Sequence, residues 1–165
     1  MGANLRFHDL EYGTKLKLGD VTVETGLLNH PGNAMGYRVN WQDLAVAYIT
    51  DTEHLQNEFD RNVFALVERA DVLIYDCTYT DDEYHHPKTS KVGWGHSTWQ
   101  EGIKLAVAAR VKKLVIFHHD PSHDDDFMDE IGIRSSAVFP DAVVAREGME
   151  ISVLASSRLH QKVMR

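Results

Sequence analysis

The segment Leu114–Asp126, LVIFHHDPSHDDD, joins a short apolar run to a group of histidines and aspartates. The run Leu114–Phe117 predicts a buried strand, and such a strand holds the side chains at its end rigidly at the rim of a sheet. Imidazole and carboxylate groups in that position bind metals or transfer protons. The segment therefore indicates a hydrolase site; its candidate residues are His118, His119, Asp120 and His123.

Three further polar residues stand where predicted strands end. His30 follows VETGLLN, Asp76 follows VLIY, and His96 lies in GWGHST. Two imidazoles and a carboxylate suit zinc, manganese or iron. Such an ion lowers the pKa of bound water to about 7 and so supplies hydroxide at neutral pH. His96, between a glycine and a predicted helix, could instead donate a proton or bind an anionic transition state.

Each of these residues also has a purely structural explanation. His30 precedes Pro-Gly and could be a turn residue, and Asp76 could cap the loop that follows it. Because His118 and His119 are consecutive, at most one of them faces inward. The run Asp124–Asp126 is typical of a solvated helix start. Two other candidates, His85 with His86 and Cys77, are interpreted as loop surface and as a small core thiol.

The elements that must position these residues are hairpins followed by strand–helix–strand units. A helix is expected around Phe59, Val63, Leu66 and Val67, which have the spacing of a buried stripe. Ser97 and Gln100 form a capping box, and the helix it opens would bury Trp99, Ile103, Ala106 and Val107. A last helix is expected around Asp125–Gly132. Strands are expected at 14–18, 21–29, 35–40, 44–50, 71–75, 113–117, 142–146 and 149–153.

Composition limits the classes of protein that this sequence can represent. The 165 residues suffice for one domain. A net charge of −8 argues against nucleic-acid binding, which depends on neutralising many phosphates. No apolar run approaches the roughly 20 residues that cross a bilayer, so no membrane partner is expected. The single cysteine permits no internal disulfide, which favours a cytoplasmic location.

Taken in order, five motifs resemble a known family. They are NHPGNAMGYRV, ITDTEH, VLIYDCTYTDDEY, GWGHST and LVIFHHDPSHDD, and they resemble the later motifs of metallo-β-lactamase-fold hydrolases. The closer resemblance is to the phosphodiesterase branch, which includes the tRNA-maturing endonucleases and the phosphonate-pathway cyclic phosphodiesterase. It covers roughly residues 5 to 155. The implied fold class is a layered α/β (α+β) structure: an incomplete metallo-β-lactamase-like sandwich, with a mixed β-sheet and flanking helices.

The resemblance also implies roles for individual residues. His30 and His118 would bind metal, and Asp76 would bridge two metal ions and share in catalysis. His96 would be the non-ligand histidine that assists proton transfer. Asp51 of TDTEH would support the site from outside the ligand set, since a metal-bound imidazole needs an outer acceptor. Three more assignments go with it: Asp120 as a second supporting carboxylate, and Ser97 and Thr98 as substrate contacts.

One departure from the family is large. Its His-x-His-x-Asp-His run is absent, and the sequence resembles only the second half of the family fold. The expected cofactor is a divalent metal, zinc or manganese with iron as a further alternative. It would bind weakly, or not at all in a truncated chain, because several ligands are needed to offset dehydration. A half-sandwich would expose a large apolar sheet face, so we expect a homodimer or a partner chain that covers it.

These observations leave a first and a second reading of the function. The first is a metal-dependent hydrolase in which metal-bound hydroxide cleaves a small or cyclic phosphodiester. The second is a non-catalytic binding or assembly module derived from the same fold. A flavodiiron-like or thiol-ester hydrolase ranks below both, since no flavin-binding segment is visible and the thiol-ester hydrolases depend even more on the absent histidine motif. Residues 1–155 are expected to form one domain and residues 156–165 a flexible tail, and the chain could be a fragment of a longer hydrolase.

Overall fold

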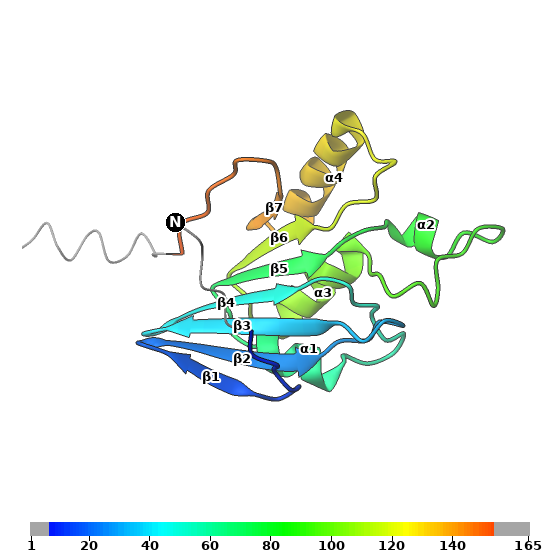
Figure 1. The fold of residues 1–165 in the computed structure, drawn as a ribbon. Helices are drawn as coiled ribbons and strands as arrows, with labels where there is room; N and C mark the ends of the chain where they lie inside the picture. Colours follow the sequence, from blue (N-terminus) through cyan, green and yellow to red (C-terminus); the bar gives the residue numbers. More distant parts are fainter. Residues whose placement is uncertain (1–6, 154–165) are drawn as a thin grey trace, which may run out of the picture.

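The computed structural model describes residues 7–153, and it forms a mixed sheet whose seven strands lie in chain order. β1 to β4 pair antiparallel, whereas β4 to β7 pair parallel. The predicted mixed sheet with flanking helices is confirmed (Figure 1). The elements are β1 Lys15–Leu18, β2 Val21–Leu27, β3 Met35–Trp41, β4 Leu44–Ile49, α1 Arg61–Val67, β5 Val72–Asp76, α2 Asp81–Tyr84, α3 Trp99–Ala108, β6 Lys113–Phe117, α4 Asp125–Val138 and β7 Ala142–Val144.

The three longer helices cover the same face of the sheet. α1, α3 and α4 each connect one parallel strand to the next, always in the same direction across the sheet. Because such crossovers are right-handed, connections that advance in one direction place every helix on one side. Figure 1 shows α1 and α3 behind the strands. The helix-facing side chains form the core; Ala47, Ile49, Leu73 and Leu114 are completely buried.

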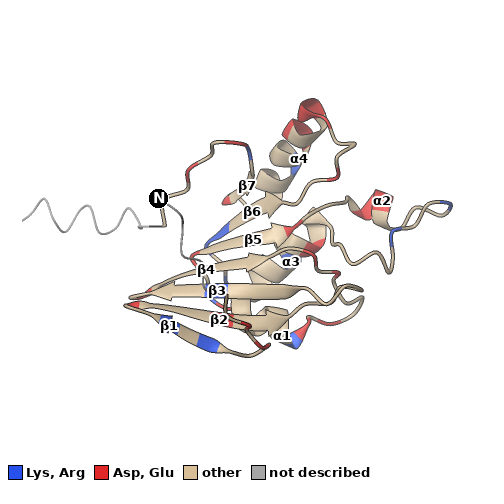
Figure 2. Ribbon diagram, in the orientation of Figure 1, with Lys and Arg blue, Asp and Glu red and all other residues tan. Residues whose placement is uncertain are grey.

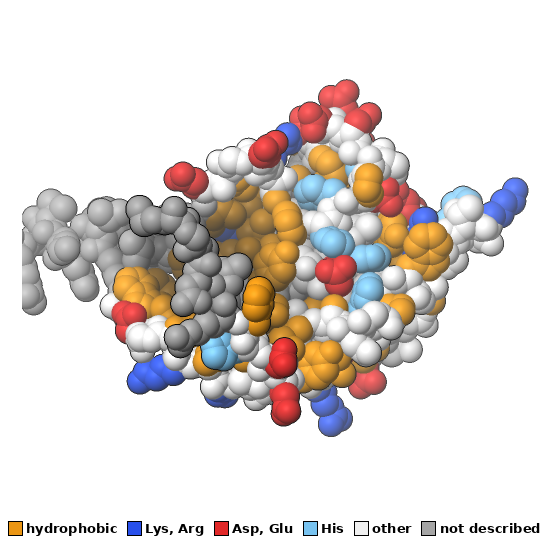
Figure 3. Space-filling view, viewed as in Figure 1, with side chains coloured by type: hydrophobic (Ala, Val, Ile, Leu, Met, Phe, Trp, Pro, Cys, Tyr) orange, Lys and Arg blue, Asp and Glu red, His pale blue; other side chains and the backbone are white. Residues whose placement is uncertain are grey.

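The opposite face of the sheet has none of the helices of residues 7–153 over it. Side chains alternate between faces along a strand, so Tyr48 lies opposite its buried neighbours Ala47 and Ile49. Tyr48 is 40% exposed, and Val39 and Trp41 of β3 are 38% and 39% exposed. Figure 3 shows hydrophobic side chains gathered over the middle of this face. We call the surface of Val39, Trp41 and Tyr48 the open face.

Four strands deliver their carboxyl ends to one edge of the sheet. β2, β4, β5 and β6 run in the same direction, because two antiparallel steps separate β2 from β4 and the other pairs are parallel. The arrowheads of β4, β5 and β6 point to this edge in Figure 1. The residues that end or follow these strands, His30, Asp51, Asp76 and His118, therefore meet at a common rim.

Several details differ from the expectation. Phe59 precedes α1 and is 41% exposed, because Asp60 caps the helix and accepts hydrogen bonds from the N–H groups of Asn62 and Val63. Thr98, not Ser97, caps α3, since its side chain accepts from Glu101 N. Val107 is 59% exposed and lies outside the buried stripe of α3.

Three other differences concern whole segments. Residues 149–153 form no strand in the described chain, so the predicted last hairpin is wrong. α4 continues to Val138, one and a half turns beyond Gly132, and the four-residue helix α2 was not foreseen. The predicted tail at 156–165 lies outside the described residues. Within residues 7–153, no helix is long and apolar enough to cross a membrane.

Candidate functional site

The predicted residues converge at the common rim. The rings of His30 and His96 lie 5.5 Å apart between centroids, and those of His96 and His118 stack at 5.0 Å. Ligand atoms of His30, Asp51 and His96 lie within 4.8 Å of one another, as do those of Asp76, His96 and His118. Figure 3 shows the histidines gathered beside the apolar middle of the open face.

Asp76 is completely buried, and both of its carboxylate oxygens are saturated with hydrogen bonds. Oδ2 also lies 2.9 Å from His96 Nδ1, which places the Nδ1 proton of His96 against Asp76. This contact raises the pKa of His96 above its ordinary value, against the effect of burial. The other donors, at 2.7–3.3 Å, are the backbone N–H groups of Asp51, Thr52, Thr78 and Ser97 and the hydroxyl of Thr78.

Asp51 differs from Asp76 in every one of these respects. Its side chain is 42% exposed, and Oδ1 lies 3.4 Å from His118 Nε2. Apart from this contact, its carboxylate accepts no hydrogen bond within residues 7–153. Asp51 and His118 both have left-handed backbones, with φ of 59° and 62°. Such conformations cost free energy in residues other than glycine and are concentrated at functional sites.

His30 is fixed by the backbone on both sides of its ring. Gly32 N donates to His30 Nδ1 at 3.0 Å, so the neutral ring carries its proton on Nε2. Gly95, with φ of 88°, lies so close that a Cβ atom there would be 2.3 Å from His30 Cδ2. A metal ion at Nε2 would require the other tautomer and the loss of the Gly32 bond.

The donor types fit a divalent metal. Imidazole nitrogens and carboxylate oxygens bind zinc, manganese and iron. Within residues 7–153 the Asp51 carboxylate accepts no backbone N–H, whereas Asp76 could bind only by exchanging some of its hydrogen bonds. His30 lies in one group with Asp51 and His96, and His118 Nε2 lies 3.4 Å from Asp51 Oδ1. Each group supplies three protein ligands, and His96 belongs to both groups. Together they offer fewer ligands than two four-coordinate metal sites need.

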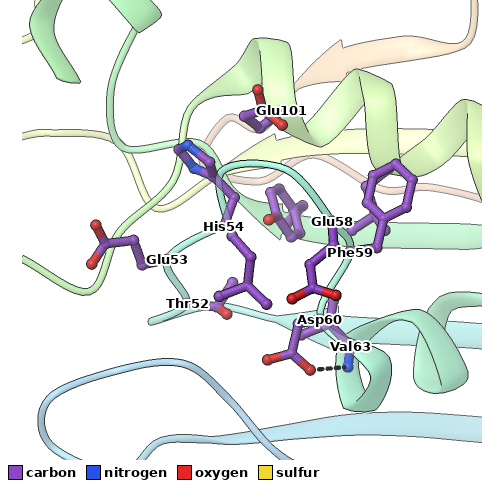
Figure 4. Close-up of a pocket in the computed structure, with 11 residues that line it drawn as sticks. Thr52, Glu53, His54, Glu58, Phe59, Asp60, Val63 and Glu101 are labelled. Carbon is purple, nitrogen blue, oxygen red and sulfur yellow. Dashed lines mark hydrogen bonds between the residues drawn. The ribbon is translucent and has the colours of Figure 1, made fainter. Parts of the chain in front are cut away.

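A second layer of polar residues lies behind the rim. His54 Nδ1 lies 3.0 Å from Ser97 Oγ, and the Tyr75 hydroxyl donates to the same oxygen at 3.3 Å. Burial lowers the pKa of His54 and raises that of Tyr75. Behind these residues is a cavity of about 20 Å³, enough for one water molecule, whose lining includes His54 and Glu101 (Figure 4).

Three predicted roles do not agree with the structure. Ser97 and Thr98 are completely buried, so neither side chain can reach a substrate. The Thr98 hydroxyl instead donates to Asp81 at 2.6 Å and caps α3. Asp120 accepts from Ser122 N and Oγ rather than from a histidine of the rim. These bonds lower the pKa of Asp120.

Sequence reasoning missed Glu53, which shapes the site, and did not predict the contact that the candidate His123 makes. Glu53, only 8% exposed, binds the loop that carries His96, whereas the motif TDTEH indicates a role for Asp51 alone. His123 Nε2 lies 2.8 Å from Glu83 Oε1 and joins the start of α4 to α2. Beside the rim, a cleft of about 310 Å³ is lined by Tyr79, Asp82, Glu83, His86, Thr89, Lys91, Asp120 and Ser122.

Relatives with curated names share part of this sequence. Ribonuclease Z of Salinibacter ruber is 32% identical over 127 residues, which cover 77% of this chain and 35% of the relative. Ribonuclease Z of Brevibacillus brevis is 32% identical over 112 residues, covering 66% of this chain and 32% of the relative. The chain thus spans about a third of the length of the curated relatives it matches.

Solved structures share the fold at low identity. The metallo-β-lactamase-fold protein YhfI of Bacillus subtilis has a TM-score of 0.65 at 19% identity, covering 85% of this chain and 53% of that one. The short form of human tRNase Z has a TM-score of 0.60 at 20% identity, with 85% and 46% covered. The β-lactamase superfamily domain model matches residues 3–119, well over half of the chain. The protein therefore belongs to the β-lactamase superfamily and has its metallo-β-lactamase fold.

Proposed function

We propose that this chain carries the metal-binding rim of a hydrolase that cleaves phosphodiesters. The observation that carries the proposal is the convergence of His30, Asp51, Asp76, His96 and His118 at one edge of the sheet. The names of relatives support the reaction class: ribonuclease Z among the sequences, and a diphosphatase of the PhnP family among the structures, at a TM-score of 0.60 and 17% identity over 86% of this chain.

The residues that would hold a metal are Asp51 and His30, which belong to one group, with His118 of the other group, whose Nε2 lies 3.4 Å from Asp51 Oδ1. We favour Asp51 over Asp76 as the principal carboxylate ligand, because its oxygens are accessible and face His118. A bound divalent ion supplies hydroxide at neutral pH and neutralises charge on the phosphoryl oxygens. Asp76 would then act mainly by orienting His96.

His96 is the group we assign to proton transfer. Asp76 holds Nδ1, so Nε2 remains for a substrate at the rim. The raised pKa of His96 favours the protonated ring, which can donate a proton to the departing alkoxide. With that proton from His96 the leaving oxygen would depart as a hydroxyl group, and hydrolysis of the diester would leave a phosphomonoester.

The net charge of the chain and the names of its relatives point to different classes of substrate. The net charge of −8 led us to expect a small or cyclic phosphodiester rather than nucleic acid. Figure 2 agrees in showing acidic residues on α2 and at the start of α4. Ribonuclease Z relatives conflict with that expectation. We therefore propose a phosphodiester and treat RNA as one of the substrates to be tested.

The test is metal analysis of the purified chain together with hydrolysis of bis-p-nitrophenyl phosphate and a short structured RNA, with added Mn²⁺ or Zn²⁺. Asp51→Asn and His118→Ala should each remove activity and lower metal content. His8→Ala is the matched control, because His8 is exposed and belongs to neither histidine group. Hydrolysis unaffected by Asp51→Asn and His118→Ala would contradict the assignment.

A second candidate is a binding module without turnover. It is favoured by the three-ligand groups, which share His96. Metal-free protein with no rate above buffer would support this alternative.

We also propose a homodimer in which a second copy covers the open face. Val39, Trp41 and Tyr48 are each more than a third exposed on a sheet whose other face is packed with helices. The chain covers only 46–53% of the tRNase Z and YhfI structures, which leaves room for further polypeptide in a complete fold. We favour a second copy as the partner because it is always present at the same concentration as the chain itself.

A further inference from the structure

Glu53 is a buried carboxylate without a basic partner. The residue is 8% exposed, and no lysine, arginine or histidine of the described chain forms an ion pair with it. Burying a charge without a counter-ion is costly unless hydrogen-bond donors surround it. Glu53 has such donors: the Tyr84 hydroxyl, Gly93 N at 2.6 Å and Gly95 N at 3.0 Å. In Figure 4 its carboxylate points away from Glu58, Asp60 and Glu101, so it is not part of an acidic cluster.

The two glycine donors belong to the turn that presents His96. Gly93 and Gly95 have φ of 85° and 88°, and Glu53 accepts from both amides, one on each carboxylate oxygen. This arrangement fixes the turn from inside. The next residue, His96, reaches Asp76 at 2.9 Å. A displacement of the turn would therefore move His96 away from its orienting carboxylate.

Glu53 also reaches His30 by two routes. Its backbone N donates to Asn29 O at 2.8 Å, and Asn29 Nδ2 donates to Glu53 O at 3.0 Å. Asn29 directly precedes His30. In addition, Gly95 packs against the His30 ring. One acidic residue thus connects the segments that carry Asp51, His30 and His96.

We propose that Glu53 is a positioning residue that sets the relative placement of His30 and His96. It touches neither ring and would act through the amides of Gly93 and Gly95 and through Asn29. Its effect on catalysis rests on the proposed hydrolase function, whereas its effect on the two rings does not. A merely structural role for Glu53 would change stability without changing the local order of the turn or the environment of the two histidines.

The experiment compares Glu53→Gln with Tyr84→Phe in the full chain without added metal. The side-chain amide introduced by Glu53→Gln would point a donor at an N–H group, whereas Tyr84→Phe removes one donor and leaves both glycine bonds. We expect hydrogen exchange at Gly93 and Gly95 to rise at least about tenfold in Glu53→Gln, with β6 amides unchanged. The ring ¹⁵N signals of His30 and His96 should shift as well. Tyr84→Phe should change exchange at both glycines by less than about threefold.

A turnover measurement completes the test. On bis-p-nitrophenyl phosphate, kcat of Glu53→Gln should fall roughly a hundredfold with KM little changed, since small misplacements of a catalytic group have effects of this size. Should Glu53→Gln fail to fold, Glu53→Asp keeps the charge but is one methylene too short to hold both amides, and it replaces the first variant. Wild-type exchange and ring signals in the folded variant would overturn the proposal. A wild-type chain without hydrolysis would refute the proposed function and leave the exchange result decisive for positioning.

Discussion

Two aspartates at the rim of the sheet, Asp51 and Asp76, have identical side chains but different environments, and we assign them different roles. Asp76 is saturated by donors and completely buried, and Asp51 is accessible and faces His118. Asp76→Asn should therefore lower the free energy of unfolding by about 3 kcal/mol, because the amide would point a donor at backbone N–H groups. Asp51→Asn should change it by less than about 0.5 kcal/mol, since asparagine tolerates the left-handed backbone.

Urea unfolding of both variants without metal measures these free energies, and calorimetric titration with Zn²⁺ or Mn²⁺ measures binding. We expect Asp51→Asn to lose more metal affinity than stability and Asp76→Asn to show the reverse. Equal stability losses in both variants would contradict the separation of roles.

Gly93 and Gly95 provide a matched pair within one turn. Both have positive φ, so an alanine at either position costs about 1–3 kcal/mol in backbone strain. A Cβ at Gly93 meets nothing within 4 Å, whereas at Gly95 it would lie 2.3 Å from His30 Cδ2 and 2.6 Å from Pro31 Cδ. Gly95→Ala should therefore cost about 1–3 kcal/mol more than Gly93→Ala in a thermal unfolding comparison, and it alone should shift the His30 ring signals. Equal losses of stability in the two variants would show that the His30 ring can move away from a Cβ atom at position 95 without cost.

The positions of the candidate residues could be predicted from the sequence, but their contacts could not. His30 and His118 follow strands whose apolar character is local, so their place at a sheet edge was predictable. The difference between Asp51 and Asp76 depends on hydrogen bonds between residues 20–25 positions apart, which no local pattern encodes. Glu53 was missed for the same reason, since its donors lie 31–42 positions away.

Among the helices and strands, the sequence predicted elements correctly where a run of residues was continuously apolar. It failed where contacts with other parts of the fold determine burial or where an element is very short. β6 has the predicted bounds, because its buried run is continuous. Val107 fits the helical spacing of α3 but is 59% exposed, since no element of residues 7–153 covers that side of the helix. α2 has four residues and no apolar period, so only its capping by Thr80 and Glu83 could have revealed it.

Glu83 makes the attachment of α2 sensitive to acid. Burial raises its pKa, but hydrogen bonds from Thr80 and His123 outweigh this effect and hold the pKa below the ordinary 4.5. A carboxylate with a lowered folded pKa stabilises the fold above its unfolded pKa, and that stability is lost as the pH falls through the folded pKa. The stability that Glu83 contributes should thus be full above about pH 4.5 and decline below it.

Glu83→Gln tests this dependence. The variant should be less stable than wild type at pH 6, and the difference should shrink below pH 4.5 as wild-type Glu83 becomes protonated. Denaturant unfolding from about pH 6 to about pH 3 measures the difference. Glu58→Gln is the control, because no hydrogen bond or ion pair to Glu58 occurs in the described chain. A difference that stays constant with pH would exclude ionised Glu83 as its source.

The two faces of the sheet differ because its strands lie in the same order in the sheet as in the sequence. Strands added in sequence, with right-handed crossovers in one direction, place the three longer helices α1, α3 and α4 on one face. The same rule puts none of these crossover helices on the open face, and the histidine rim lies beside that face. The strand order therefore explains both the histidine rim and the exposed apolar surface beside it. A partner that covers the open face would also limit access to the rim.

The oligomeric state tests what covers this face. A stable interface buries about 800 Å² per partner with an apolar centre, and Tyr48, which contacts Phe117 on the same face at 6.2 Å between ring centroids, lies in the central part of the sheet. We expect sedimentation velocity at micromolar concentration to show a dimer, and Tyr48→Glu to raise its dissociation constant at least about tenfold, because a carboxylate would be buried there without a partner. Val107→Glu is the control, since Val107 is exposed on the helix-covered side of the sheet. A wild-type monomer at tens of micromolar would contradict the homodimer.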